Sequence, residues 1–254
     1  MSDQDVIYAE RVEEGIEAIV FNQPEKRNAI SADMMDRLVL LLRDADADES
    51  TKVIILKGRG DHFSSGGDLS QGATGERGPE VSRKRLRHYL EALRTVRRIA
   101  KPVIAMVDGY AVGGAFSLVL ACDLVCVSDQ ACFVPAFCQI GIVPEMGMMK
   151  YLPELVGSQK AKEILFLGDR LSGQDMLDLG LANRLFPKAT LESDTIAFAK
   201  RLASMPDASI QIAKGIMNSV ADGGLEWTLE AESTASPFCT ITKAHAEAVR
   251  RFKK

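Results

Sequence analysis

Apolar and polar positions along the first three quarters of the chain predict strands and helices in turn. Residues 6–12 and 16–21 have the two-residue period of a hairpin. Short apolar runs at 53–57, 103–107 and 124–127 have the length of buried strands. Apolar residues at helical spacing predict an amphipathic helix over residues 81–100. Three further helices are predicted to begin after serine N-caps, at Ser31, Ser158 and Ser172, and Ser172 forms a capping box with Asp175.

The chain divides by pattern into two regions. Strands and helices alternate through residue 190, whereas from Leu191 the pattern is helical, with breaks at Pro206, Gly223–Gly224 and Pro237. This predicts an α/β core over residues 1–190 and a helical region over 191–254. Because the helical region is too short to bury a core of its own, we expect it to pack on a neighbouring subunit.

Two glycine-rich segments follow predicted strands and suggest a functional site. Phe63–Leu69 comes after the strand at 53–57, and Asp108–Ala115 lies between the strand at 103–107 and a helix. Glycine allows a close approach of the backbone to a ligand, and a helix start presents unpaired N–H groups. The turns therefore offer one donor each, the N–H groups of Ser65 and Gly114, to a developing oxyanion. Purely structural turns are the alternative for each segment taken singly.

Composition and charge exclude several classes of protein. The 254 residues are 46% hydrophobic and 26% charged, which is typical of a globular chain, and the net charge of −4 does not indicate a nucleic-acid partner. No apolar run reaches the ~18 residues of a membrane span. The N-terminus lacks the layout of a signal peptide, so we expect a cytoplasmic protein. The 5 cysteines include no CxxC pair and no histidine at ligand spacing, which indicates free thiols and no metal site.

Several segments resemble the enoyl-CoA hydratase/isomerase (crotonase) superfamily: Pro24–Ala29, Phe63–Leu69, Lys101–Ala105, Asp108–Gly114, Ala121–Leu124, Leu167–Ser172 and Gly180–Asn183. The resemblance implies an α/β fold with a crotonase-like ββα-spiral core that binds acyl-CoA (residues 1–190) and a helical C-terminal trimerisation region (191–254). It further implies a homotrimer, or a hexamer built as a dimer of trimers. The implied ligand is an acyl-CoA thioester, with coenzyme A as part of the substrate and no separate cofactor. In such proteins the N–H groups that match Ser65 and Gly114 hold the thioester oxygen as an enolate forms.

The reactive side chains depart from the hydratase pattern. At the two positions where hydratases carry glutamates, this chain has Ser117 and Phe137, which cannot activate water as paired carboxylates do. One acid remains, Glu145, in a run similar to the single-glutamate segment of Δ3,Δ2-enoyl-CoA isomerases. The resemblance therefore implies an isomerase in which Glu145 is the catalytic base, and hydratase activity is not expected. A carboxylate that only stabilises a helix start is the alternative for Glu145.

The resemblance also implies a substrate-binding set around the turns: Lys26, Arg27, Ala29, Ser64, Gly66, Gly67, Asp68, Leu69, Gly113, Ser117 and Phe137. The basic end, Arg250–Lys254, either reaches the phosphates of coenzyme A or is a frayed tail.

Two other functions remain open: ring isomerisation or other enolate chemistry on an aromatic acyl-CoA, and non-catalytic binding of acyl-CoA. Dehalogenation is disfavoured, because its nucleophile is an aspartate with a partnering tryptophan, whereas this chain has Glu145 and Phe137. The sequence leaves open the acyl group, trimer versus hexamer, and whether Glu145 acts alone.

Overall fold

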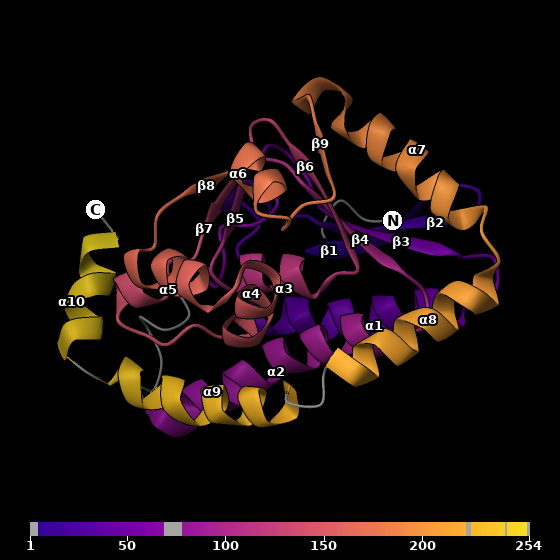
Figure 1. Cartoon of the computed structure of the whole chain (residues 1–254). Coiled ribbons are helices and arrows are strands. Elements are labelled where there is room, and N and C mark those ends of the chain that lie inside the picture. Colours follow the sequence, from indigo (N-terminus) through magenta and orange to yellow (C-terminus); the bar gives the residue numbers. More distant parts are fainter. Residues whose placement is uncertain (1–4, 69–77, 222–224, 242, 253–254) are drawn as a thin grey trace.

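The computed structural model describes residues 5–68, 78–221, 225–241 and 243–252. Its main sheet has six strands in the order β1-β2-β3-β4-β6-β9, of which only β1 is antiparallel to its neighbour (Figure 1). The strands are β1 (Ile7–Glu13), β2 (Ile16–Phe21), β3 (Val53–Gly58), β4 (Val103–Val107), β6 (Leu124–Ser128) and β9 (Arg184–Phe186). A smaller sheet contains β5 (Tyr110–Val112), β7 (Cys132–Val134) and β8 (Leu171–Ser172). The predicted mixed α/β class is confirmed.

Apolar residues cover both faces of the main sheet, which explains why its central strands are continuous apolar runs. In β3, Ile54 and Leu56 point to one core, while Val53 and Ile55 point to the other. The first core lies under most of the helices that precede residue 190: α1 (Ala32–Ala47), α2 (Pro79–Arg98), α3 (Gly114–Ala121), α4 (Met148–Val156), α5 (Ser158–Leu167) and α6 (Gly173–Asp178). Short 3₁₀ turns lie between them: η1 (Pro24–Lys26), η2 (Cys138–Ile140) and η3 (Lys188–Thr190).

Two of the three predicted N-caps are confirmed. The Ser31 hydroxyl accepts the N–H of Met34 at 3.1 Å, and Ser172 forms the predicted reciprocal capping box with Asp175. The prediction for Ser158 is wrong by one residue. Gly157, in a conformation that suits glycine, is the N-cap of α5, and Ser158 is the first helical residue.

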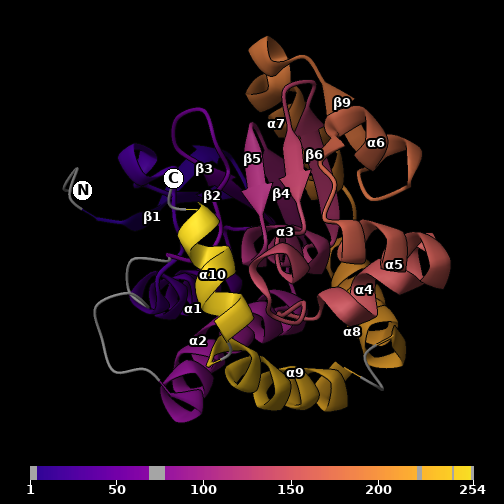
Figure 2. The same ribbon diagram turned by 90° about the vertical axis from the view of Figure 1, so that its left-hand side faces the viewer.

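The C-terminal helices pack on other elements of their own chain: α7 (Leu191–Ala203), α8 (Asp207–Ala221), α9 (Leu225–Thr240) and α10 (Lys243–Phe252). α7 covers the second face of the sheet and so completes its core, although residue 191 is where the predicted oligomerisation region begins. α8 is fixed by the buried Lys214, which pairs with Asp123 at 2.7 Å. α9 lies along α2 (Figures 1 and 2).

The predicted helix breaks have different outcomes. Pro206 separates α7 from α8, as predicted, while Gly223–Gly224 lies outside the described residues. The break predicted at Pro237 is wrong, because this proline lies inside α9. A proline removes one N–H from the helix ladder. Near that position α9 packs along α2, where the hydroxyls of Thr240 and Ser82 lie 3.4 Å apart.

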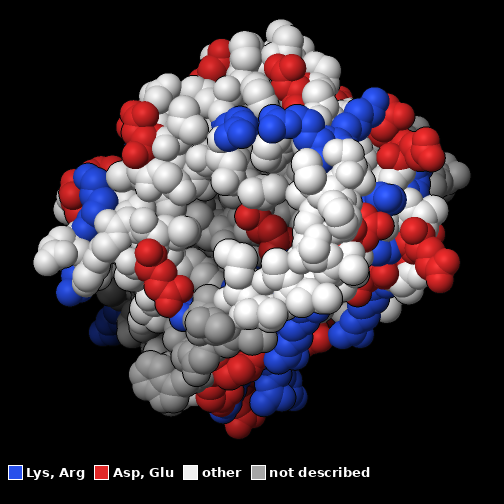
Figure 3. Space-filling model, turned by 45° about the vertical axis from the view of Figure 1, so that its right-hand side comes forward, with Lys and Arg blue, Asp and Glu red and all other residues white. Residues whose placement is uncertain are grey.

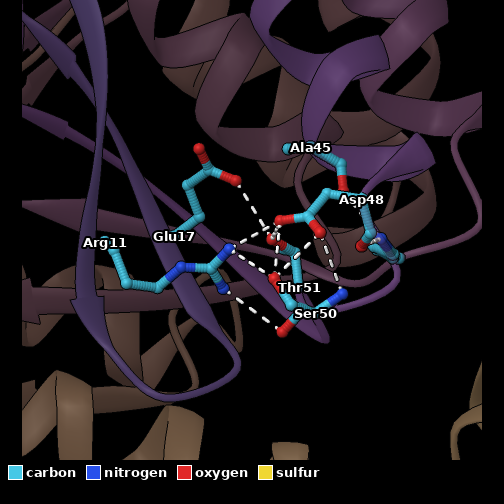
Figure 4. Close-up of polar contacts among 7 residues, drawn as sticks. Arg11, Glu17, Ala45, Asp48, Ser50 and Thr51 are labelled. Carbon is cyan, nitrogen blue, oxygen red and sulfur yellow. Dashed lines mark hydrogen bonds and ion pairs between the residues drawn. The ribbon is translucent and has the colours of Figure 1, made fainter.

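A polar network closes the C-terminal end of α1 (Figure 4). Asp48 accepts hydrogen bonds from Ser50 and Thr51 and pairs with Arg11 at 2.6 Å. Beside it the buried Lys101 donates its ammonium protons to the carbonyl oxygens of Ala45, at 2.7 Å, and Asp48. These are among the carbonyls that a helix end leaves unpaired. The pKa of Lys101 is lowered by burial, which the nearby acids partly oppose.

We expect Lys101→Met to lower the free energy of unfolding by about 1–3 kcal/mol, because the buried Ala45 carbonyl loses its ammonium donor, whereas the Asp48 carbonyl keeps the N–H of Thr51. Urea unfolding followed by circular dichroism measures this change. Lys52→Met is the matched control, since Lys52 is half-exposed and its ammonium lies a long 3.4 Å from the Asp207 carboxylate. A surface pair of this kind contributes about 1 kcal/mol at most. Equal effects of the two substitutions would contradict the role given to Lys101.

Neither the described helices nor the surface charge of the face in Figure 3 points to a membrane span or a nucleic-acid interface. Among the described helices, none is long and apolar enough to cross a membrane. Acidic and basic side chains intermingle on the face drawn in Figure 3, which is hollowed near its centre. That face therefore lacks the uniform positive field typical of nucleic-acid binding.

Candidate active site

The two glycine turns lie side by side. The N–H of Ser64 donates to the carbonyl of Tyr110 at 2.8 Å, and the N–H of Val112 donates back to Ser64 at 3.1 Å. Gly66, with φ +85°, is so close to β5 that a Cβ there would lie 2.5 Å from the Val112 carbonyl oxygen. The first turn is thus bonded to the strand that leads directly into the second turn.

The second turn opens α3. Gly113 has φ +53° and donates its N–H to the carbonyl of Val134 at 2.8 Å. Gly114 is the first residue of α3, so its N–H belongs to the group that a helix ladder leaves without an acceptor. The buried ring of Phe137 lies 3.8 Å from the place of a Cβ on Gly113. An N–H group beside an aromatic wall suits a carbonyl attached to an apolar acyl group.

The other predicted donor already has a partner. The N–H of Ser65 donates to the carbonyl of Arg27 at 2.8 Å, and the Ser65 hydroxyl reaches the carbonyl of Lys26 at 3.3 Å. An oxyanion role for this N–H therefore requires the bond to Arg27 to be shared or released when a thioester binds. Non-local contacts of this kind leave no signal in the local sequence.

The segment around Glu145 reaches the same helix start. Glu145 is half-buried between Pro144 and Met146, which are both buried. The Met146 sulfur lies 2.9 Å from the place of a Cβ on Gly114, so the residue after Glu145 packs directly on the predicted oxyanion donor. The N-cap of α4 is Gly147, and the first turn of this helix holds no acid. Glu145 itself lies two residues before this N-cap.

Ser117, one of the predicted substrate-binding residues, lies inside the protein. It is fully buried, and its hydroxyl donates to the backbone carbonyl of Glu145 at 2.9 Å, with the carbonyl of Gly113 at 3.4 Å. The hydroxyl is therefore occupied within the protein, between α3 and the segment that carries Glu145.

Tyr89 on α2 belongs to the same region, although it is absent from the residues predicted from the sequence. Its hydroxyl donates to the carbonyl of Ile30 at 2.9 Å. Burial raises its pKa to about 12, and the charges of Glu145 and Asp68 add to this rise, whereas Arg85 opposes it. Tyr89 thus lies within electrostatic reach of both acids. Its helical spacing from the inward-facing leucines of α2 is the signal that identifies it.

Asn28 is a second residue that the predicted set lacks. It is fully buried, with φ +53°, and its side chain accepts the N–H of Gln23 and donates to the carbonyls of Arg59 and His62. It thereby ties the early segment to the chain that leads into the first turn. A buried amide with three partners is a structural brace.

The predicted substrate-binding residues of the early segment lie beside the first glycine turn. Lys26 and Arg27 are exposed, and their carbonyls contact Ser65. Ala29 is half-buried beside Asn28, and Gly67 is exposed at the bridge to Ile30. Leu69 lies outside the described residues, as do the last two lysines of the basic end.

Four described cysteines are free thiols, as predicted: Cys122, Cys126, Cys132 and Cys138. Burial raises the pKa of Cys126 to about 11, so it remains a neutral thiol at physiological pH. Within the described residues, no three His, Cys, Asp or Glu side chains are placed together to hold a metal ion.

A sheet core that joins two glycine turns at one helix start defines the class of crotonase-fold proteins, whose members act on acyl-CoA. The chain belongs to the enoyl-CoA hydratase/isomerase family, because the model of that family matches residues 11–253. The predicted crotonase-like core with C-terminal helices is thereby confirmed.

Individual relatives differ in their named activities. The chain is 34% identical over 219 residues to 4-chlorobenzoyl coenzyme A dehalogenase-2 of an Arthrobacter species, a match that covers 85% of this chain and 78% of the relative. The structure of Pseudomonas aeruginosa OdaA matches with a TM-score of 0.89 and 29% identity over 98% of this chain and 99% of that one. An enoyl-CoA hydratase from Bacillus anthracis matches with a TM-score of 0.82 and 28% identity, covering 98% and 96% of the two chains.

Proposed function

We propose that this protein isomerises 3-enoyl-CoA to 2-enoyl-CoA. Glu145 removes a proton from C2, and the electron pair moves into the thioester carbonyl to form an enolate. The N–H of Gly114, with that of Ser65 once its bond to Arg27 is shared, stabilises the negative oxygen. The enolate then collapses as Glu145 returns the proton to C4, so that the double bond ends between C2 and C3. No atom is gained or lost.

The position of Glu145 carries the proposal. Met146 packs on Gly114, which sets the acid-bearing segment against the predicted oxyanion donor. A single carboxylate suffices for a proton that leaves one carbon and returns to another. Hydration would instead need acids at the positions of Ser117 and Phe137, of which the first is bonded to the Glu145 carbonyl and the second is buried against Gly113.

Chemistry on an aromatic acyl-CoA is the second candidate. The similarity to proteins named as 4-chlorobenzoyl coenzyme A dehalogenases favours it. So does the Phe137 ring beside Gly113, since aromatic rings stack favourably on one another. Glu145 in place of a nucleophilic aspartate makes ring isomerisation a better match than loss of halide.

A panel of thioesters tests these functions. We expect the protein to convert 3-hexenoyl-CoA to 2-hexenoyl-CoA without adding water to the product, and to release no chloride from 4-chlorobenzoyl-CoA. Proton NMR of the reaction mixtures follows the double bond, and an ion-selective electrode follows chloride. Turnover restricted to aromatic thioesters would favour the second candidate. Calorimetric binding of every thioester without turnover would identify an acyl-CoA binder.

We also propose a cytoplasmic homotrimer or dimer of trimers. Exposed apolar side chains lie on the outer faces of α5 and α8, where another copy would cover them: Phe166, Leu167, Ile212, Ile216 and Met217. Contiguous exposed apolar patches typically mark association surfaces. The assembly remains a prediction.

A further inference from the structure

Ser117 connects the two parts of the candidate site. It is the fourth residue of α3, the helix whose first residue is Gly114, and it is fully buried. A hydroxyl has one hydrogen to donate. The contact with the Glu145 carbonyl, at 2.9 Å, is much shorter than that with the Gly113 carbonyl, at 3.4 Å, and so takes this hydrogen. One helical turn therefore holds both Gly114 and the segment of Glu145.

The chain after Glu145 needs such a support. Met146 has φ +57° and Gly147 has φ +74°, so two consecutive residues adopt the left-handed conformation. This conformation is uncommon for methionine and persists where the surroundings fix it. The N–H of Met148 reaches the Glu145 carbonyl at 3.3 Å, a long contact that holds it less firmly than the Ser117 hydroxyl does.

We propose that Ser117 is a positioning residue, which sets the direction of Glu145 relative to the Gly114 N–H by holding the Glu145 carbonyl. The inference rests on the proposed function, in which Glu145 carries the proton. Ser117 occupies the sequence position of a hydratase glutamate, but its hydroxyl bonds to a backbone carbonyl instead of activating water. A displacement of about 1 Å at a reacting group can cost about 100-fold in rate.

Ser117→Ala tests the inference. We expect kcat for 3-hexenoyl-CoA to fall by about 10–100-fold, because the freed carbonyl lets Glu145 depart from its reactive position. KM, and the affinity for the unreactive butyryl-CoA measured by calorimetry, should stay within about threefold, since the acyl-CoA contacts remain. Ser117→Thr keeps the hydroxyl and should recover most of the lost kcat.

Thr95→Val is the matched control. Thr95 is also buried in a helix, where its hydroxyl donates to the Glu91 carbonyl at 2.8 Å, but it lies in α2, outside the candidate site. We expect this variant to keep the parental kcat. A comparable loss of kcat in Thr95→Val would show that any missing buried hydroxyl has the effect, and would overturn the inference.

The remaining outcomes separate this inference from the proposed function. A Ser117→Ala protein with parental kcat, beside an inactive Glu145→Gln protein, overturns the role of Ser117 alone. A loss of butyryl-CoA affinity that equals the loss of kcat also overturns it, because Ser117 would then act in binding. A Glu145→Gln protein with parental turnover overturns the proposed function itself.

Discussion

Glu145→Gln is expected to lower kcat for 3-hexenoyl-CoA by about 1,000-fold, which corresponds to about 4 kcal/mol of barrier. Glutamine has the same shape as glutamate but cannot take a proton from C2. The predicted oxyanion donors and the Phe137 ring remain, so the affinity for butyryl-CoA should stay within about threefold. Steady-state turnover by NMR and calorimetric titration measure the two quantities on the same protein.

Glu154→Gln is the control for this substitution. Glu154 lies on α4, nine residues after Glu145, and its exposed carboxylate pairs with Lys150. It should keep the parental kcat, because it is a surface ion pair with no place in the site. Parental turnover by the Glu145→Gln protein would show that the proton is carried by another group, and the proposed mechanism would be wrong.

The sequence predicts the scaffold well because its signals are local. The strand cores of β3 and β4 are short apolar runs, and the Ser31 and Ser172 caps act within three residues of themselves. Each glycine turn is likewise recognisable from one contiguous segment. The order of strand, glycine segment and helix is therefore retained in the structure, although the second segment also contains the short strand β5, which the sequence pattern does not predict.

The details of the site depend on contacts between distant segments, which no local pattern encodes. The Ser65 N–H meets the carbonyl of Arg27, and the Ser117 hydroxyl meets the carbonyl of Glu145. In both cases a residue predicted to face the ligand bonds to backbone from another part of the chain. The sequence predicts candidate residues of the site, while the partners of these residues become visible only in the folded chain.

The boundary between the two predicted regions shows the same limit. The pattern changes from alternating to helical at Leu191, yet α7 completes the core of the sheet through Leu191 and Ala199. Period and composition identify a helix, but they do not say which surface the helix covers. Similarly, α9 continues through Pro237 and packs along α2, neither of which the local pattern predicts.

The second large effect is expected for Gly66→Ala in the first glycine turn. Gly66 has φ +85°, and an added Cβ would lie 2.5 Å from the carbonyl oxygen of Val112. Because the obstacle is backbone, no side chain can rotate away, and the turn must separate from β5. The left-handed conformation and the clash together should lower the free energy of unfolding by about 3 kcal/mol. This corresponds to a fall in Tm of roughly 6–12 °C.

Gly67→Ala distinguishes this effect from a general cost of replacing glycine. Gly67 is exposed, and a Cβ there would meet no atom within 4 Å. The unfolding free energy of the Gly67→Ala protein should therefore stay within about 0.5 kcal/mol of that of the parent protein. Differential scanning calorimetry of both proteins measures the contrast. Equal Tm values for the two variants would mean that the first turn is not held against β5, and that Ser65 is not fixed beside the strand that leads to Gly114.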